Sequence, residues 1–425
     1  MIRIILLLYN KVLIPFLWVM FFILCFRVLA RFPSGIFEGL FLVLMVFCMA
    51  VSIREIVVGW SKGVSNYYQL ILLPLFILPF IVALQAHNIF GQPYLMGLLA
   101  QRQHFIIFAG YFLVLQFQKG KIEPQIFERR MLLALGIIMS IMMLFSIFID
   151  PRVFNGTDFV EFSLNKGWHY EFPSDVIATV ILYSTFKVLS ENRFRYLIPL
   201  SLGLLYFVIY IQDRSQLLVI TTTIGIYFLR NVTLGKKVIY ASWGILLLLT
   251  GIGIIKLVNP DLIDHYVTIF TNASTIATGG HTSEYSTNMR LAEGAIALKG
   301  FIDHPLFGNG FVSAQYKGGF SGFFGYFYAS DVGILGNLFV YGLIGTLIFY
   351  IPFLLVLSWT RKLRKIEDNL LTTAQYGLIF IFMDMITAAS NIKYMGLPTI
   401  LFAIIYYYRF RNEKTEAETN TLTAQ

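Results

Sequence analysis

Long apolar runs separated by short polar segments dominate the pattern along this chain. A membrane-spanning helix needs about 20 mainly apolar residues, because lipid offers no hydrogen-bond partner to an exposed backbone. By that criterion we expect about twelve transmembrane helices. They fall near residues 12–29, 36–53, 67–86, 103–118, 131–149, 175–189, 196–212, 215–230, 238–256, 331–357, 371–389 and 395–410. The pattern therefore predicts an all-α polytopic membrane protein with about twelve transmembrane helices.

Composition supports this interpretation, and charge adds an orientation. The chain is 57% hydrophobic and 13% charged, against about 25% charged residues in a soluble domain. Short basic segments between alternate apolar runs are typical of cytoplasmic loops. Placing the N-terminus in the cytoplasm puts most of the 32 basic residues on that side, so both termini are expected there. The net charge of +9 is spread over these loops, which argues against nucleic acid as a partner.

The same topology divides the chain. Residues 1–256 are expected to hold transmembrane helices 1 to 9 and an outer loop at 150–174. A large outer loop with short helices spans 257–330, and residues 331–411 hold helices 10 to 12. The polar segment 412–425 is expected to be a disordered cytoplasmic tail. Long loops outside linkers are usually functional, so the chemistry is expected on the outer side.

Two arginines stand out on that side. Arg214 ("IQDRSQ") occupies a tight outer turn between two predicted helices. It either extends to the interface beside Asp213 or serves a functional site. Arg290 and Glu293 lie three residues apart on a predicted amphipathic helix, where they form either a solvated pair or part of a site. That helix ends at "FIDHPLFGNG" (301–310), where Pro305 and two glycines turn the chain.

The segment 310–333 alternates glycine with Phe and Tyr, and it holds Lys317 and Asp331. Its aromatic rings form either an interfacial belt or a stacking surface for sugars. Asp331 is placed to cap the following helix or to act as a base. The sequence has no His-x-x-x-His pair, Asp-x-Asp, Walker loop or Gly-x-Ser-x-Gly, so we expect no metal site and no cofactor.

Three of these features together resemble the O-antigen polymerase and O-antigen ligase superfamily of bacterial envelope glycosyltransferases. They are the outer-turn arginine in "DRSQLLVI", the outer-loop Arg290 followed by "DHPLFGNG", and the helix carrying "VYGLIG" (Val340–Gly345). The similarity covers roughly residues 196–360. It implies a twelve-helix protein of the bacterial inner membrane, with a periplasmic loop that acts on undecaprenyl-diphosphate-linked oligosaccharide. A flippase and a chain-length regulator are the implied partners.

The resemblance implies transfer of a glycan from its lipid diphosphate to an acceptor hydroxyl. Such a reaction needs positive charge at the diphosphate, for which the candidates are Arg214, Arg290 and Lys317. It also needs a base, for which the candidates are Asp331, then His304 and His281. We therefore predict a metal-independent polymerase of oligosaccharide repeat units, for O-antigen, capsule or exopolysaccharide.

Three alternatives remain open from the sequence. The first is an O-antigen ligase that transfers glycan to lipid A core or protein. In ligases a His-Asn pair stands where this chain has Ser330-Asp331. The second is a flippase or transporter of lipid-linked oligosaccharide, which is expected to place charged or broken-helix sites near the midplane. The third is a scaffold protein, for which two long outer loops with arginines have no evident use.

Overall fold

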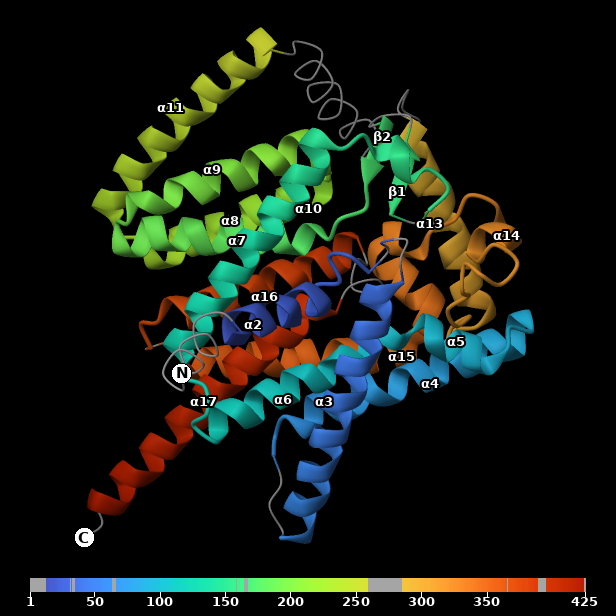
Figure 1. The fold of residues 1–425 in the computed structure, drawn as a ribbon, viewed down its shortest axis with the longest axis horizontal. Helices are drawn as coiled ribbons and strands as arrows, with labels where there is room; N and C mark the ends of the chain where they lie inside the picture. Colours follow the sequence, from blue (N-terminus) through green and yellow to red (C-terminus); the bar gives the residue numbers. More distant parts are fainter. Residues whose placement is uncertain are drawn as a thin grey trace, which may run out of the picture.

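The protein is described by a computed structural model that covers residues 13–30, 32, 35–62, 66–157, 159–163, 167–258, 285–364, 366–388 and 395–423. Helices dominate these ranges (Figure 1). The first half contains α2 (Ile14–Cys25), α3 (Ile36–Ser61), α4 (Gln69–Phe90), α5 (Tyr94–Ala100), η2 (Arg102–Ile106), α6 (Ile107–Gln118), α7 (Pro124–Phe148), η3 (Pro151–Phe154), β1 (Val160–Ser163), β2 (Gly167–Tyr170), α8 (Ser174–Glu191), η4 (Phe194–Tyr196), α9 (Leu197–Tyr206) and η5 (Phe207–Ile211). The second half contains α10 (Arg214–Asn231), α11 (Leu234–Val258), α13 (Tyr285–Asp303), α14 (Phe320–Phe324), η6 (Ala329–Asp331), α15 (Gly333–Lys362), α16 (Asn369–Thr387) and α17 (Gly396–Thr423).

Each of the twelve apolar segments predicted from the sequence contains a helix. Among the described residues, six helical stretches are long and apolar enough to cross a membrane: α3, α4, α7, Phe194–Ile211, α15 and α16. The pair Tyr94–Ala100 and Arg102–Gln118, bent by 52°, adds a seventh if it forms one span. The structure therefore shows a helical protein with the spans of a multi-pass membrane protein. The count of twelve spans stays a prediction.

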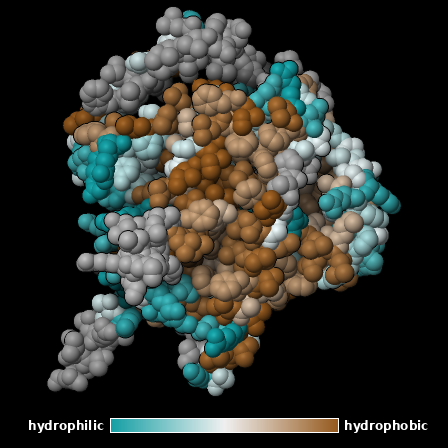
Figure 2. Space-filling model, in the orientation of Figure 1, coloured by the Kyte–Doolittle hydropathy of each residue, from teal (hydrophilic) through white to brown (hydrophobic). Residues whose placement is uncertain are grey.

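The outer surface of the bundle is apolar, as lipid contact requires. Figure 2 shows hydrophobic residues over the middle of one face, with hydrophilic residues toward its lower and right edges. On α3, Val43 and Val46 expose 68% and 60% of their surface. A soluble protein rarely exposes apolar patches this continuous, so a bilayer is the environment that fits this surface.

The interior is organised around two helices. α15 packs against α4, α13, α16 and α17, and α8 packs against α7, α9, α10 and α16. α8 is buried from Asp175 to Val188. A helix buried on all sides belongs inside a bundle, and α8 is surrounded by helices from both halves of the chain.

The segment "FIDHPLFGNG" fills a break in α15. Gly342 has φ +64° and ψ −171° in the middle of that helix, which frees backbone groups on both sides. Leu343 and Ile344 donate N–H bonds to the carbonyls of Pro305 and Leu306 at 2.8 and 2.9 Å. In return, Asn309 and Gly310 donate to the carbonyls of Phe339 and Val340 at 2.8 and 2.9 Å. The elbow thus satisfies the hydrogen bonds that the broken helix has lost.

Glycine is required where the elbow meets its neighbours. Gly308 has φ +69°, and a Cβ there would lie 2.6 Å from the Val340 carbonyl oxygen and collide with the Gly342 nitrogen. A Cβ on Gly310 would collide with the backbone of α4 at Ala86. The elbow is therefore wedged between α4 and α15, in contact with the backbone of both.

The C-terminal segment differs from the disordered tail expected over 412–425. α17 continues to Thr423. Arg409 pairs with Glu413 at 2.8 Å, and Asn412 donates to Glu416 at 2.7 Å. Both pairs are four residues apart, and such pairs stabilise a helix in water. The polarity of the segment predicts disorder, whereas these pairs favour a helix.

Candidate functional site

A cavity of about 770 Å³ lies where four distant parts of the chain meet. Its lining residues come from 27–30 at the end of α2, 96–103 around the α5–η2 bend, 157–171 at the β hairpin, and 311–331. All four parts fall in segments that the sequence places on the outer side. A cavity of this size is in the range of small-molecule sites.

Two arginines line this cavity, and neither was predicted from the sequence. Arg27 and Arg102 both form ion pairs with Glu38, in the first turn of α3. Arg102 approaches the Glu38 carboxylate with Nε and one terminal nitrogen, each at 3.0 Å, and donates its other terminal nitrogen to the Leu99 carbonyl at 2.8 Å. This shared carboxylate fixes both guanidinium groups, because an arginine–carboxylate fork restricts orientation.

Local backbone structure brings each arginine to the cavity. α2 ends at Cys25 because Arg27 adopts the left-handed conformation, φ +55°, that terminates helices. Its guanidinium lies 5.0 Å from the ring centre of Phe41, which is a cation–π distance. Arg102 opens η2, directly after the bend from α5. The helix end and the bend therefore place charged groups beside apolar helices.

Asp331 is the one predicted site residue that lines the cavity. It ends η6, and Ser330 donates to its Oδ1 at 2.8 Å. Within the described chain its Oδ2 accepts no hydrogen bond, so that oxygen is available to a ligand. The cap role considered for Asp331 is wrong: α15 begins at Gly333, and its N-cap is Val332 without a side-chain bond. The intervening η6 turn moves the carboxylate away from the helix start.

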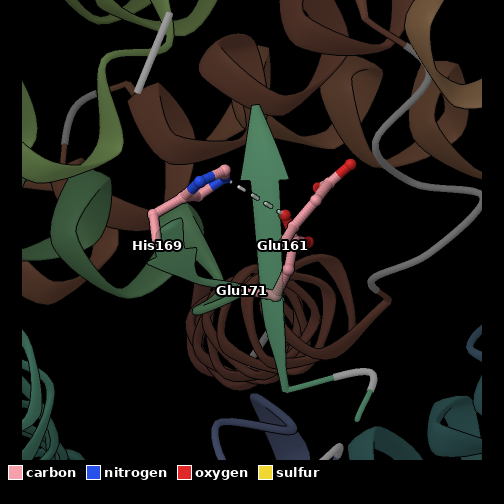
Figure 3. A group of neighbouring side chains, drawn as sticks. All are labelled: Glu161, His169 and Glu171. Carbon is pink, nitrogen blue, oxygen red and sulfur yellow. Dashed lines mark ion pairs between the residues drawn. The ribbon is translucent and has the colours of Figure 1, made fainter. Parts of the chain in front are cut away.

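A second group of ionisable residues lies at the hairpin. β1 and β2 are antiparallel, with Glu161 opposite His169. Glu161 and Glu171 line the cavity, and His169 Nε2 lies 3.8 Å from Glu171 Oε1. Figure 3 shows the three side chains at the hairpin, with a dashed line between His169 and Glu171. Two hairpin carboxylates thus line the same cavity as Arg27 and Arg102.

An aromatic wall completes the cavity. Phe311, Phe320 and Phe327 line it with Tyr326 and Tyr328, whose ring centres are 5.3 Å apart. Partial burial, followed by the carboxylates of Glu293 and Asp331, raises the pKa of Tyr326 to about 12. Its phenol therefore stays protonated at neutral pH and remains a hydrogen-bond donor. Rings with a polar tip suit the apolar face and hydroxyls of a sugar.

The other predicted residues lie elsewhere. Arg290 is exposed on α13, whereas Glu293 is buried and accepts the Tyr328 N–H at 2.9 Å. Lys317 lies over the rings of Tyr316 and Phe323 at 5.2 and 5.8 Å.

Arg214 is the first residue of α10, behind its cap Asp213, and His304 is exposed in the elbow. None of Arg214, Arg290, Lys317 and His304 is among the cavity-lining residues. His281 lies outside the described residues.

A sequence signal for the missed arginines did exist. Arg27 falls inside the apolar run 12–29, and Arg102 directly precedes the run 103–118. A charge at membrane depth is a functional candidate by default, so the positions of Arg27 and Arg102 mark them as candidates in the same way as Arg214. The sequence does not show that both arginines pair with Glu38. That shared ion pair identifies Arg27 and Arg102 as one cluster.

Comparisons with known proteins leave the family open. A scan against protein-family models finds no match, and a search of curated proteins finds no similar sequence. The geometry of the cavity therefore carries the functional argument.

Proposed function

We propose that this chain is a membrane glycosyltransferase that polymerises lipid-diphosphate-linked oligosaccharide repeat units on the outer face of the membrane. The observation that carries the proposal is the cavity, which combines Arg27 and Arg102, the carboxylate of Asp331 and an aromatic wall. Each part meets one need of the reaction: charge for a diphosphate, a base for a hydroxyl, and rings for sugars. The donor class itself comes from the sequence resemblance.

The proposed reaction uses the cavity as follows. An acceptor sugar hydroxyl attacks the anomeric carbon of the donor, and the bond from that carbon to the diphosphate oxygen breaks. Asp331 Oδ2 takes the hydroxyl proton, while Arg27 and Arg102 stabilise the charge on the departing lipid diphosphate. Direct displacement inverts the configuration at the anomeric carbon. No acid is required at the leaving oxygen, because a diphosphate is stable as an anion.

Arg102 has the capacity for this role. A guanidinium carries five N–H donors. The contacts with Glu38 and Leu99 use one N–H on each of its three nitrogens. Within the described residues the other N–H groups of its terminal nitrogens make no hydrogen bond, so they can bind a ligand in the cavity that Arg102 lines. Glu38 keeps the guanidinium in place before the substrate arrives, which lowers the cost of ordering it.

The test is a deletion strain complemented with wild type, Arg102→Ala or Arg290→Ala, with surface glycan separated on a gel. A polymerase deletion leaves single repeat units on the acceptor, and wild type restores a ladder. Arg102→Ala is expected to behave like the deletion at normal protein level. Long polymer stranded on its lipid carrier in the deletion would identify a ligase and contradict the proposal.

A transporter of lipid-linked oligosaccharide is the second candidate, favoured by one observation. The chain bends by 52° between Tyr94–Ala100 and Arg102–Gln118, and discontinuous helices are common at transporter sites. Accumulation of repeat units on the cytoplasmic side of the deletion strain supports that candidate. Repeat units that reach the outer side without polymerising support the polymerase.

A further inference from the structure

Strand pairing assembles a three-residue cluster that no sequence motif indicates. Glu161 on β1 lies opposite His169 on β2, and residues directly opposite in an antiparallel pair project to the same face. Glu171 follows His169 by two positions, so it returns to that face. The ligand atoms of the three side chains all lie within 4.8 Å of one another. Figure 3 shows the three side chains beside one another at the hairpin.

The histidine ring is oriented for a cation. Its Nδ1 lies 3.1 Å from the Gly167 carbonyl oxygen, and a carbonyl only accepts, so Nδ1 carries the hydrogen. In a neutral ring, Nε2 then directs its lone pair toward Glu171 Oε1 at 3.8 Å, a separation too long for a hydrogen bond. A backbone carbonyl on the other ring nitrogen is the usual support of a metal-binding histidine.

We propose that Glu161, His169 and Glu171 bind a divalent transition-metal cation, Zn²⁺ or Mn²⁺, at the wall of the cavity. One imidazole nitrogen and two carboxylates suit these ions, whereas Ca²⁺ and Mg²⁺ prefer oxygen alone. Metal–ligand bonds of about 2.0–2.2 Å require the donors to move inward by roughly an ångström. Side-chain rotation can supply that movement for Glu161 on β1, His169 on β2 and Glu171 directly after β2.

The charges of the cavity give the cation a role. Two arginines face three carboxylates among the described lining residues: Arg27 and Arg102 against Glu161, Glu171 and Asp331. Counted over these lining residues alone, the formal charge is −1 without a cation and +1 with a divalent ion. The ion therefore adds positive charge where a diphosphate would bind. This role rests on the proposed function, whereas the cation site rests on the cluster alone.

The first experiment uses the full chain, purified in nanodiscs and stripped with a chelator, and titrated calorimetrically with Zn²⁺ and with Mn²⁺. Wild type is expected to bind one equivalent. His169→Ala and the isosteric Glu171→Gln are expected to weaken binding at least about tenfold, as even supporting residues of metal sites do. His87→Ala is the matched control, because His87 Nδ1 also lies beside a backbone carbonyl, that of Gln92 at 2.8 Å. Absence of stoichiometric binding in wild type, or equal loss in the control, overturns the site.

Co²⁺ loading of wild type guards against variants that fail to fold. A visible absorption spectrum typical of Co²⁺ bound by nitrogen and oxygen ligands supports the site. The spectrum of hexaaquo Co²⁺ overturns it. The role of the cation is tested separately by polymer formation in His169→Ala. If wild type binds the metal and His169→Ala, which has lost it, still forms a normal ladder, the role of the cation in diphosphate binding is overturned. The cation site itself then stands. A wild type that polymerises and binds no metal overturns the cation site and leaves the proposed polymerase standing.

Discussion

The cavity and the elbow differ in how they are built and in how they appear in the sequence. The elbow, residues 301–310, is conspicuous in the sequence, since proline, glycine and polar residues crowd between apolar runs. In the structure it repairs the backbone of α15 and places His304 at the surface. The cavity comes from four inconspicuous segments, yet it gathers two arginines and three carboxylates. In this protein the conspicuous motif, the elbow, supports the fold. The candidate functional site is formed by the packing of segments that are distant in the sequence.

The largest effect is expected from Asp331→Asn compared with His304→Ala. Removing a general base slows a reaction by about 10²–10⁴-fold, so Asp331→Asn should abolish visible polymer. The amide keeps the shape and still accepts a hydrogen bond from Ser330. His304→Ala should leave the ladder unchanged, because that side chain lies outside the cavity. Rates of polymer formation with purified protein decide between them, and a normal rate in Asp331→Asn contradicts the assigned base.

Arg102→Ala compared with Arg290→Ala is expected to have the next largest effect. Loss of one donor to a developing charge costs about 10²–10³-fold in rate, so Arg102→Ala should stop polymerisation and Arg290→Ala should change it less than about twofold. Arg102→Lys keeps the charge without the fork and should recover only part of the rate. The opposite ranking of Arg102 and Arg290 would restore the sequence-based assignment of the diphosphate site.

The helices and part of the candidate site could be predicted from the sequence, for different physical reasons. Apolar run length placed a helix in each of the twelve predicted segments, because backbone hydrogen bonds in lipid leave few options. Asp331 was found because it stands at the predicted start of the helix 331–357, where the resemblance to the ligases places a polar pair. Arg27 and Arg102 were missed because their common partner, Glu38, is 11 residues from one and 64 from the other. The strand register that joins Glu161 to His169 is likewise set by tertiary packing.

Gly308→Ala tests the structural role of the elbow, and its effect is expected to be smaller than that of Arg102→Ala. The new Cβ would press on the Val340 carbonyl oxygen at 2.6 Å and adopt a positive φ, so we expect a loss of roughly 2–3 kcal/mol in the free energy of unfolding. Gly325→Ala is the matched control, because Gly325 has φ +75° with open space around its Cβ position. Its cost should be about 1 kcal/mol, from backbone strain alone. Thermal unfolding in detergent measures both, and equal losses would show that the wedge between α4 and α15 adds nothing.

The smallest effect is expected from Tyr326, where two variants separate ring from hydroxyl. Tyr326→Ala removes a stacking surface worth about 0.5–1.5 kcal/mol, so the apparent affinity for the sugar lipid should fall up to about tenfold. Tyr326→Phe keeps the ring and should weaken affinity only about twofold. The pKa of Tyr326, raised to about 12, keeps the phenol neutral below that pH. Deprotonation of Tyr326 therefore adds no pH dependence to wild-type affinity near neutrality. KM measured for both variants across the neutral range checks this. A larger loss of affinity in Tyr326→Phe than in Tyr326→Ala would exclude stacking as the contribution of the aromatic wall. The wall would then bind the ligand through its polar groups, as proposed for Arg27 and Arg102.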